Sequence, residues 1–276
     1  MTTRALRDAH RHIGVLPEYP FYGGPAIRPD TCARATVQQF YSALDDEGVE
    51  RALVLPNYGV PDPDVAFGLN ALALEAAQQD DRVRCGLWLS PKASDSGRND
   101  RALALVGERG VRALKTSFLL GGAPDDPDCA DQLDRIFAAA AEHDLVVHVH
   151  TSPGAASDVD RVGQLVERYG DDVRIHLVHL GGGMSGHLKL VGGRLFDWIA
   201  AGKRVYTDTS WAIGFAPRWL VDQIRVRGVG ADRVLFATDS PWGDVEGEHA
   251  RLLAATGGDT ELAEAFFRTN FEALYG

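Results

Sequence analysis

Two pairs of histidines, each separated by one residue, stand out in the sequence: His10 with His12, and His148 with His150. If each pair lies on a β-strand, its two imidazoles point to the same side, because side chains on a strand alternate with a period of two. Asp8 precedes the first pair at the same spacing. With 9 histidines in 276 residues, a single pair is expected by chance roughly 0.3 times. Two pairs, each in a β-like run, indicate a metal site with imidazole and carboxylate ligands.

The composition narrows the class of protein. A net charge of −11 argues against binding to nucleic acid or to an anionic membrane surface, and no apolar run reaches the ~18–20 residues of a membrane span. The first twelve residues lack the apolar core of a secretory signal. The three cysteines, Cys32, Cys85 and Cys129, are too widely spaced for a disulfide or zinc-finger pattern. We therefore expect a cytoplasmic protein that acts on a small molecule, and we leave a homo-oligomer open.

Strand-like and helical runs alternate along the chain. The strand-like runs are the opening stretch around residues 8–12 and residues 49–55, 83–89, 111–118, 145–151, 173–180, 204–210 and 234–239. The helical runs are residues 36–46, 63–79, 101–109, 128–142, 159–169, 188–201, 217–227, 245–255 and 261–274. This alternation implies parallel βαβ units, and eight units predict a single-domain (β/α)8 TIM barrel over residues 1–276. The alternative, a doubly wound open sheet, requires a glycine-rich loop that the turn after His12 lacks.

Active sites of such barrels lie at the carboxyl ends of the strands. The side chains found at those ends are His10, His12, Asn57, Lys115, His148, His150, His179, Asp208 and Asp239. We therefore expect them to gather at one rim of the barrel. Period-two alternation places His179 on the inner face of its strand and predicts that His176 faces the helices. His143, His187 and His249 lie beside or within predicted helices and are expected at the surface.

Several motifs occur in a fixed order along the chain. They are Asp-x-His-x-His at residues 8–12, Val-Val-His-Val-His-Thr at 146–151, His-Leu-Gly-Gly at 179–182, Phe-Ala-Thr-Asp-Ser-Pro-Trp at 236–242 and Asn-Phe-Glu-Ala-Leu-Tyr at 270–275. The series resembles the amidohydrolase superfamily. It is most similar to the amidohydrolase-2 branch, which includes enzymes like aminocarboxymuconate-semialdehyde decarboxylase. The resemblance runs from residue 5 to residue 275.

The resemblance implies a set of metal ligands. These are His10, His12, His150 and Asp239, with His179 as either a ligand of a second metal or an acid/base group. His150 matches the family position better than His148, although alternation leaves His148 within reach. Asp8, one pleat deeper, is expected to orient a histidine. Zinc is the first choice of divalent ion, with iron or manganese as alternatives, and one or two ions are expected.

Other predicted site residues surround this centre. Lys115 occupies the strand-four position where binuclear members carry a carboxylated lysine, and it is alternatively an ammonium that pairs with a substrate carboxylate or carbonyl. Tryptophans after strands seven and eight suggest a large apolar or aromatic substrate. The predicted substrate-binding residues are Asn57, His148, Asp208, Trp211 and Trp242. Specificity is expected to reside in the loops at residues 15–31, 119–127 and 211–219.

A mixed histidine and aspartate site favours a metal-dependent hydrolase. Such a metal lowers the pKa of a bound water towards ~7 and polarises a carbonyl, here an amide, ester or lactone of a small carboxylate-bearing substrate. Asp239 would accept the proton of that water, and His179 would stabilise the developing charge or protonate the leaving group. The alternatives are a non-oxidative decarboxylase of an aromatic or unsaturated acid, a non-haem iron oxygenase and a non-enzymatic ligand-binding barrel.

Overall fold

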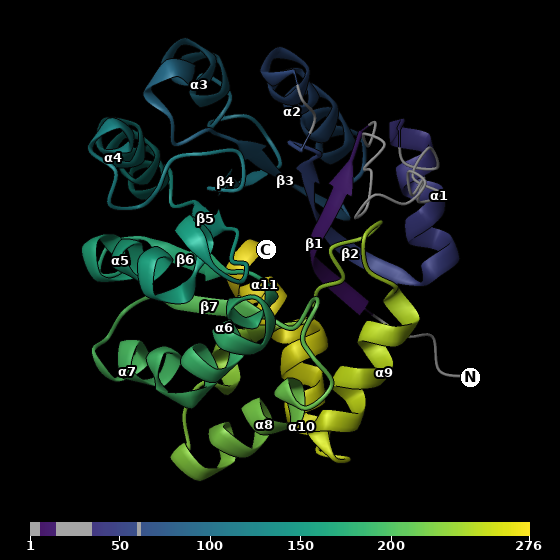
Figure 1. Cartoon of the computed structure of the whole chain (residues 1–276). Coiled ribbons are helices and arrows are strands. Elements are labelled where there is room, and N and C mark those ends of the chain that lie inside the picture. Colours follow the sequence, from purple (N-terminus) through teal and green to yellow (C-terminus); the bar gives the residue numbers. More distant parts are fainter. Residues whose placement is uncertain (1–5, 15–34, 60–61) are drawn as a thin grey trace, which may run out of the picture.

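The structure, a computed structural model, describes residues 6–14, 35–59 and 62–276. Eight parallel strands follow one another around a barrel in chain order, as predicted (Figure 1). The strands are β1 (Leu6–Ile13), β2 (Val49–Pro56), β3 (Val83–Trp88), β4 (Val111–Thr116), β5 (Val146–Val149), β6 (Arg174–Leu177), β7 (Val205–Asp208) and β8 (Val234–Leu235). The predicted loop at residues 15–31 lies outside the described residues.

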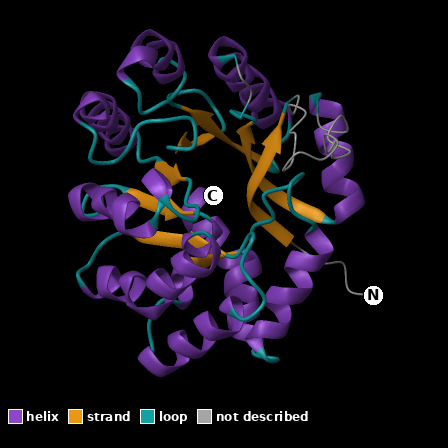
Figure 2. Cartoon of the chain, viewed as in Figure 1, coloured by secondary structure: helices purple, strands orange, loops and turns teal. Residues whose placement is uncertain are grey.

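Helices surround the strands, so the chain forms the (β/α)8 barrel that the alternating pattern predicts (Figure 2). They are α1 (Val37–Glu47), α2 (Pro63–Gln79), α3 (Ser96–Leu103), α4 (Pro127–Glu142), α5 (Val159–Tyr169), α6 (Gly183–Lys189), α7 (Leu195–Ala200), α8 (Ala216–Arg227), α9 (Val245–Thr256), α10 (Thr260–Glu264) and α11 (Asn270–Tyr275). Within the described ranges, none of them has the length and apolar character needed to cross a membrane.

Local sequence signals set where the helices start and stop. Thr36 caps α1 in a reciprocal arrangement with Gln39, and Gly48 ends that helix in the left-handed conformation with φ 68°. Asp62 accepts a hydrogen bond from Asp64 at the start of α2, whose first residue is Pro63. These signals explain why the predicted bounds of α1 and α2 agree closely with those observed.

The barrel is closed between its first and last strands. The backbone N–H of Ala9 donates to the carbonyl of Phe236 (3.0 Å), and the N–H of Asp239 donates to the carbonyl of His10 (2.8 Å). Helix α11 fills the interior from the amino-terminal side, where Phe271, Leu274 and Tyr275 pack with apolar residues of the strands. In Figure 1 this helix appears at the centre of the ring of strands. The lower barrel is therefore a packed core, and the site can form only above it.

Strand β6 differs from the prediction in a way that matters for the site. It ends at Leu177, and His179 follows in a short 3-10 turn, η4 (His179–Gly181), with a positive φ of 60°. Alternation therefore does not extend from His176 to His179. His176 is paired in register with His148 of β5 and lies fully buried inside the barrel. The prediction that His176 faces the helices is wrong.

Two further histidines are buried where a surface position was predicted. His187 in α6 is fully buried and contacts the carbonyl of Leu180 through Nδ1 (2.9 Å). His249 in α9 packs against the rings of Phe236 and Phe267. Both helices turn one face to the barrel, and these histidines lie on that face. His143 is exposed, as predicted.

Candidate metal centre

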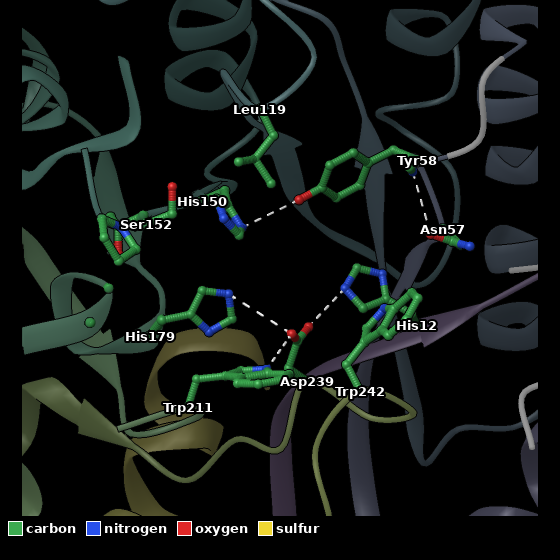
Figure 3. Close-up of a pocket in the computed structure, with 15 residues that line it drawn as sticks. His12, Asn57, Tyr58, Leu119, His150, Ser152, His179, Trp211, Asp239 and Trp242 are labelled. Carbon is green, nitrogen blue, oxygen red and sulfur yellow. Dashed lines mark hydrogen bonds and ion pairs between the residues drawn. The ribbon is translucent and has the colours of Figure 1, made fainter. Parts of the chain in front are cut away.

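A cavity of about 520 Å³ opens at the carboxyl ends of the strands, where the sequence places the site (Figure 3). Its polar lining combines imidazole, carboxylate and amide groups with hydroxyls, and its remaining walls are apolar or aromatic. The described lining residues are His12, Asn57, Tyr58, Gly59, Leu119, His150, Thr151, Ser152, Pro153, His179, Gly182, Gly183, Trp211, Asp239 and Trp242.

The tightest cluster joins β1 to the segment after β8. The Nε2 atoms of His10 and His12 are 3.1 Å apart, and each lies 3.0 Å from Oδ1 of Asp239. The pairing register between β1 and β2 shifts between Asp8 and Arg11, next to the first histidine. Asp239 has a positive φ of 56° and is tied by its N–H to the carbonyl of His10. The backbone therefore brings a carboxylate directly against two imidazoles.

Hydrogen bonds on the far sides of the rings decide which nitrogens carry protons. Nδ1 of His12 lies 3.3 Å from the carbonyl of Pro56, which can only accept. The hydroxyl of Ser210 donates to Oδ1 of Asp208 (2.6 Å), so Ser210 Oγ accepts from Nδ1 of His179 (2.8 Å). We therefore assign the protons of His12 and His179 to Nδ1. Their Nε2 atoms turn lone pairs towards Asp239.

This arrangement fits a divalent cation. Nε2 of His179 is 3.9 Å from Oδ2 of Asp239, and the ligand atoms of His10, His179 and Asp239 all lie within 4.8 Å of one another. Burial, followed by repulsion from neighbouring cationic groups, lowers the pKa of His10 and His150. Burial also lowers the pKa of His179, against the opposing effect of Asp239 and Asp208. Neutral imidazoles and a carboxylate are the forms that bind metal. Lone pairs this close to one another repel unless a cation lies among them.

His150 lines the same cavity on the side opposite Asp239 (Figure 3). Its ring centroid is 4.9 Å from that of His179, and its Nδ1 is 3.4 Å from the hydroxyl of Tyr58. Among the described residues, the groups of three side chains whose possible ligand atoms all lie within 4.8 Å of one another do not include His150. Its role as a ligand stays a prediction.

Lys115, His148 and Asp208 lie beneath the cavity, fully buried, rather than in its lining. Nζ of Lys115 is 3.1 Å from Nδ1 of His148, whose ring centroid is 4.6 Å from that of His10. Burial lowers the pKa of Lys115 to about 7, against the opposing effect of Asp239 and Asp208. The structure thus gives the predicted substrate-binding residues His148 and Asp208 no direct access to a ligand in this cavity.

Three of the remaining predicted residues line the cavity, and the fourth, Asp8, contacts the backbone around it. Asn57, Trp211 and Trp242 line the cavity, and the indole N–H of Trp211 donates to Oδ2 of Asp239 (2.7 Å). Asp8 accepts the backbone N–H groups of His10 (3.1 Å) and Thr238 (3.0 Å). It therefore holds the backbone between β1 and β8 and contacts no imidazole ring of the cluster directly.

Sequence reasoning missed several residues of the site. Tyr58 lines the cavity, and its ring stacks on Trp88 with centroids 4.3 Å apart. Ser210 fixes the proton of His179, and Ser152 forms part of the wall. Tyr58 and Ser210 lie two residues after the ends of β2 and β7, so their position was a usable signal. Leu119, which also lies in the wall, falls within the loop at residues 119–127 that was expected to set specificity.

The carboxylate of Asp239 is ionised. Burial raises its pKa, but in the cation-free protein the hydrogen bond that it accepts from His12 and the charges of His179, His12 and Lys115 outweigh burial and hold the pKa below its usual value. Its side chain is only 11% exposed, and it lines the cavity. The site can therefore offer an anionic ligand or base at neutral pH.

Comparison with known proteins extends over almost the whole chain. The Amidohydro_2 family model, described as an amidohydrolase, matches residues 8–276. No curated protein sequence matches the chain.

Solved structures share the fold at low sequence identity. A dihydroxybenzoic acid decarboxylase from Polaromonas sp. JS666 with bound manganese is 15% identical (TM-score 0.68, covering 99% of this chain and 97% of that one). A 4-oxalomesaconate hydratase from Rhodopseudomonas palustris is 16% identical (TM-score 0.65, 98% and 95%). An amidohydrolase from Burkholderia multivorans with bound zinc is 14% identical (TM-score 0.64, 98% and 99%).

Proposed function

The chain belongs to the amidohydrolase-2 family of metal-dependent enzymes, and on that basis we propose that it hydrolyses a carbonyl compound with a small aromatic or apolar body. One observation carries this proposal: the ionised carboxylate of Asp239 lies at the base of a largely apolar cavity, beside three imidazoles. Such a group is suited to accept a proton from water.

The residues that would hold the cation are His10, His12, His179 and Asp239, with His150 next to them. A divalent ion bound there supplies Lewis acidity towards the carbonyl oxygen of the substrate. Zinc and manganese, the ions bound in the Burkholderia and Polaromonas structures, are the first ions to test.

Asp239 acts as the base in this proposal. Its carboxylate takes a proton from water as the water oxygen bonds to the carbonyl carbon. When the bond to the leaving group breaks, Asp239 returns that proton to the leaving atom. One residue therefore both accepts and donates the transferred proton. The indole N–H of Trp211 holds Oδ2 of Asp239 in place (2.7 Å).

His179 serves as a ligand rather than as an acid. Its Nδ1 proton is engaged by Ser210 (2.8 Å), so Nε2 has a lone pair and no proton to donate. The sequence left His179 open as a ligand of a second metal or as an acid/base group, and the hydrogen bonds favour metal binding, here to the same ion as His10 and His12.

The walls of the cavity favour an aromatic or apolar substrate. Tyr58, Trp211 and Trp242 present aromatic surface, and Leu119 adds an apolar contact at the rim. Within the described part of the lining there is no lysine or arginine. A carboxylate on the substrate would therefore have to be held by the cation or by Asn57.

Decarboxylation of an aromatic acid is the second candidate, and the aromatic walls support it. The similar fold of a dihydroxybenzoic acid decarboxylase is consistent with it. Such a reaction needs an acid that protonates carbon, and the low pKa of Asp239 leaves this carboxyl group without a proton at neutral pH. Hydrolysis is therefore the better match.

Product analysis on one enzyme preparation separates these reactions. Protein freed of metal with a chelator and reloaded with zinc or manganese is given aryl esters, aryl lactones and anilides, and in parallel hydroxybenzoic acids. We expect metal-dependent hydrolysis of at least one carbonyl substrate, lost in Asp239→Asn. Release of CO₂ from a hydroxybenzoate without hydrolysis of any ester, lactone or anilide would contradict the proposal. Turnover that requires iron and consumes O₂ would instead favour an oxygenase.

A further inference from the structure

Four buried polar atoms converge beneath the cavity without a hydrogen bond of good geometry: Nδ1 of His10, Nε2 of His148, Nε2 of His176 and Oδ2 of Asp208. Nε2 of His176 is 3.0 Å from Oδ2 of Asp208, and Nδ1 of His10 is 3.9 Å from the same oxygen. His148 offers a ligand atom within 4.8 Å of those of His10 and Asp208. Three imidazoles thus surround one carboxylate, and all four side chains are at most 1% exposed.

In each ring, the partner of the nitrogen that faces away from Asp208 shows whether the nitrogen that faces Asp208 carries the proton. The charged Nζ of Lys115 has no lone pair, so it donates to Nδ1 of His148 (3.1 Å). Oδ2 of Asp208 can only accept, so the proton of His176 lies on Nε2 (3.0 Å), and Nδ1 of His176 accepts from the hydroxyl of Tyr275 (2.6 Å). Both rings therefore carry their proton on Nε2, towards Asp208. His10 turns Nε2 to the cation site and so carries its proton on Nδ1, again towards Asp208.

The other oxygen of Asp208 connects it to His179. Oδ1 accepts the backbone N–H of His179 (3.0 Å), the backbone N–H of Ser210 (3.0 Å) and the hydroxyl of Ser210 (2.6 Å). Ser210 in turn accepts the Nδ1 proton of His179 (2.8 Å). One carboxylate therefore faces the ring of His10 and, through Ser210, holds the ring of His179.

The charge of Asp208 is stabilised by these contacts. Burial raises the pKa of Asp208, but hydrogen bonding and charge from His176, together with His179 and Ser210, outweigh burial and lower it. The N–H and O–H groups directed at its two oxygens therefore stabilise this anion in the buried site.

We propose that Asp208 is a positioning residue of the metal centre: it fixes the proton position and the orientation of His10 and His179, and His148 and His176 complete its ring of donors. This inference rests on the proposed metal centre. It also assigns a role to Lys115, which keeps His148 in the proton-donating form and does not bridge two metals. The centre then holds one ion, because the lower imidazoles have no lone pair available.

Metal titration tests this proposal without relying on catalysis. The metal-free protein is titrated with Zn²⁺ against a chelator that competes for the ion, and bound metal is counted by elemental analysis. We expect one Zn²⁺ per wild-type chain and a dissociation constant raised about 10- to 100-fold in Asp208→Asn, still with one site. Ser210→Ala removes the link to His179 and one donor to Asp208 but leaves the contacts of Asp208 with His10 and His176, so it is expected to weaken binding by a smaller factor.

Asp95→Asn is the matched control. Asp95 is also a buried carboxylate, but it pairs with Arg98 (3.0 Å) and contacts none of these histidines. We expect wild-type Zn²⁺ affinity in this variant. Circular dichroism of each metal-free variant checks folding, and Ser210→Ala keeps the test decisive if Asp208→Asn does not fold.

Two results would overturn the proposal. Unchanged Zn²⁺ affinity in folded Asp208→Asn and Ser210→Ala would show that Asp208 does not position the ligands. Two ions in the wild type and one in Asp208→Asn would show that Asp208 is itself a ligand. A wild-type protein that binds no divalent ion would contradict the proposed metal centre itself, which is a different failure.

Discussion

At the scale of single residues, proton positions decide what each imidazole of this site can do. His12 and His179 have their protons engaged by Pro56 and Ser210, and this leaves lone pairs in the cavity. His176 has its proton directed at Asp208. The same residue type thus offers a lone pair at the rim and a proton one layer below. Hydrogen-bond partners on neighbouring strands make this distinction.

Lys115 makes stability depend on pH. Its folded pKa of about 7 lies below the ordinary value of 10.5, so the unfolded chain takes up a proton first as the pH falls from 10.5. The metal-free wild type should lose up to about 5 kcal/mol of unfolding free energy between pH 10.5 and pH 7, and no more below that range. Lys115→Met should lack this dependence.

Urea unfolding of both metal-free proteins at pH 9.5 and pH 7.5 measures the effect. The comparison uses the change of unfolding free energy with pH in each protein, so the hydrogen bond to His148 that the variant loses cancels to first order. Equal changes in the two proteins would show that Lys115 titrates normally.

At the scale of elements, the turns after the strands place the ligands. The turn η4 carries His179, and the N–H of Gly182 closes it by donating to the carbonyl of His179 (2.8 Å). Gly182 has a φ of 75°, and a Cβ on it would lie 2.5 Å from Cα of Ser152. This glycine therefore allows the turn after β6 to pack against the loop after β5, which carries His150.

Gly182→Ala is expected to separate these two loops. Backbone strain alone costs about 1–2 kcal/mol in the left-handed region, and the clash with Ser152 adds to it. Gly202→Ala is the matched control, because Gly202 has a φ of 80° and no atom within 4 Å of the added Cβ. We expect Gly182→Ala to lower the unfolding free energy more than Gly202→Ala and to weaken Zn²⁺ binding, which Gly202→Ala should leave unchanged. Equal effects of the two substitutions would show that the close approach is unimportant.

The elements also show what the sequence could and could not reveal. Apolar and helical runs predicted the strands and most helix bounds, although the helix expected at residues 101–109 is α3, Ser96–Leu103. The rim that collects His10, His12, His179 and Asp239 was therefore predictable. The position of His176 was not, because β6 leaves its regular geometry after Leu177 and alternation cannot report such a change. Proton assignments depend on partners such as Ser210, far from His179 in the chain, and no local pattern contains them.

The prediction that His249 lies at the surface was wrong for a different reason. Val245, Glu248, His249 and Leu252 are the buried positions along most of α9, and their spacing of three and four residues is that of one helix face. The pattern was present in the sequence. The polar character of histidine was given more weight than its position on that face.

At the scale of the whole molecule, the barrel is closed below the site by α11. Phe271 is fully buried among residues of several strands, so Phe271→Ala should cost about 3–5 kcal/mol of unfolding free energy. Val226→Ala, at a position 81% exposed, should change it by less than about 0.5 kcal/mol. Denaturant unfolding measures both. A loss of less than about 1 kcal/mol for Phe271→Ala would show that α11 is not part of the cooperative core.

The closure of β1 against β8 has a consequence for how the protein is made. His12 leaves the ribosome 227 residues before Asp239, whose Oδ1 lies 3.0 Å from the Nε2 atoms of both His10 and His12 in the folded protein. Tyr275, which donates to His176 below the site, comes later still. A nascent chain therefore holds the two histidines without their carboxylate. The candidate ligand set is therefore complete only after Asp239 has been synthesised and β1 has paired with the end of β8.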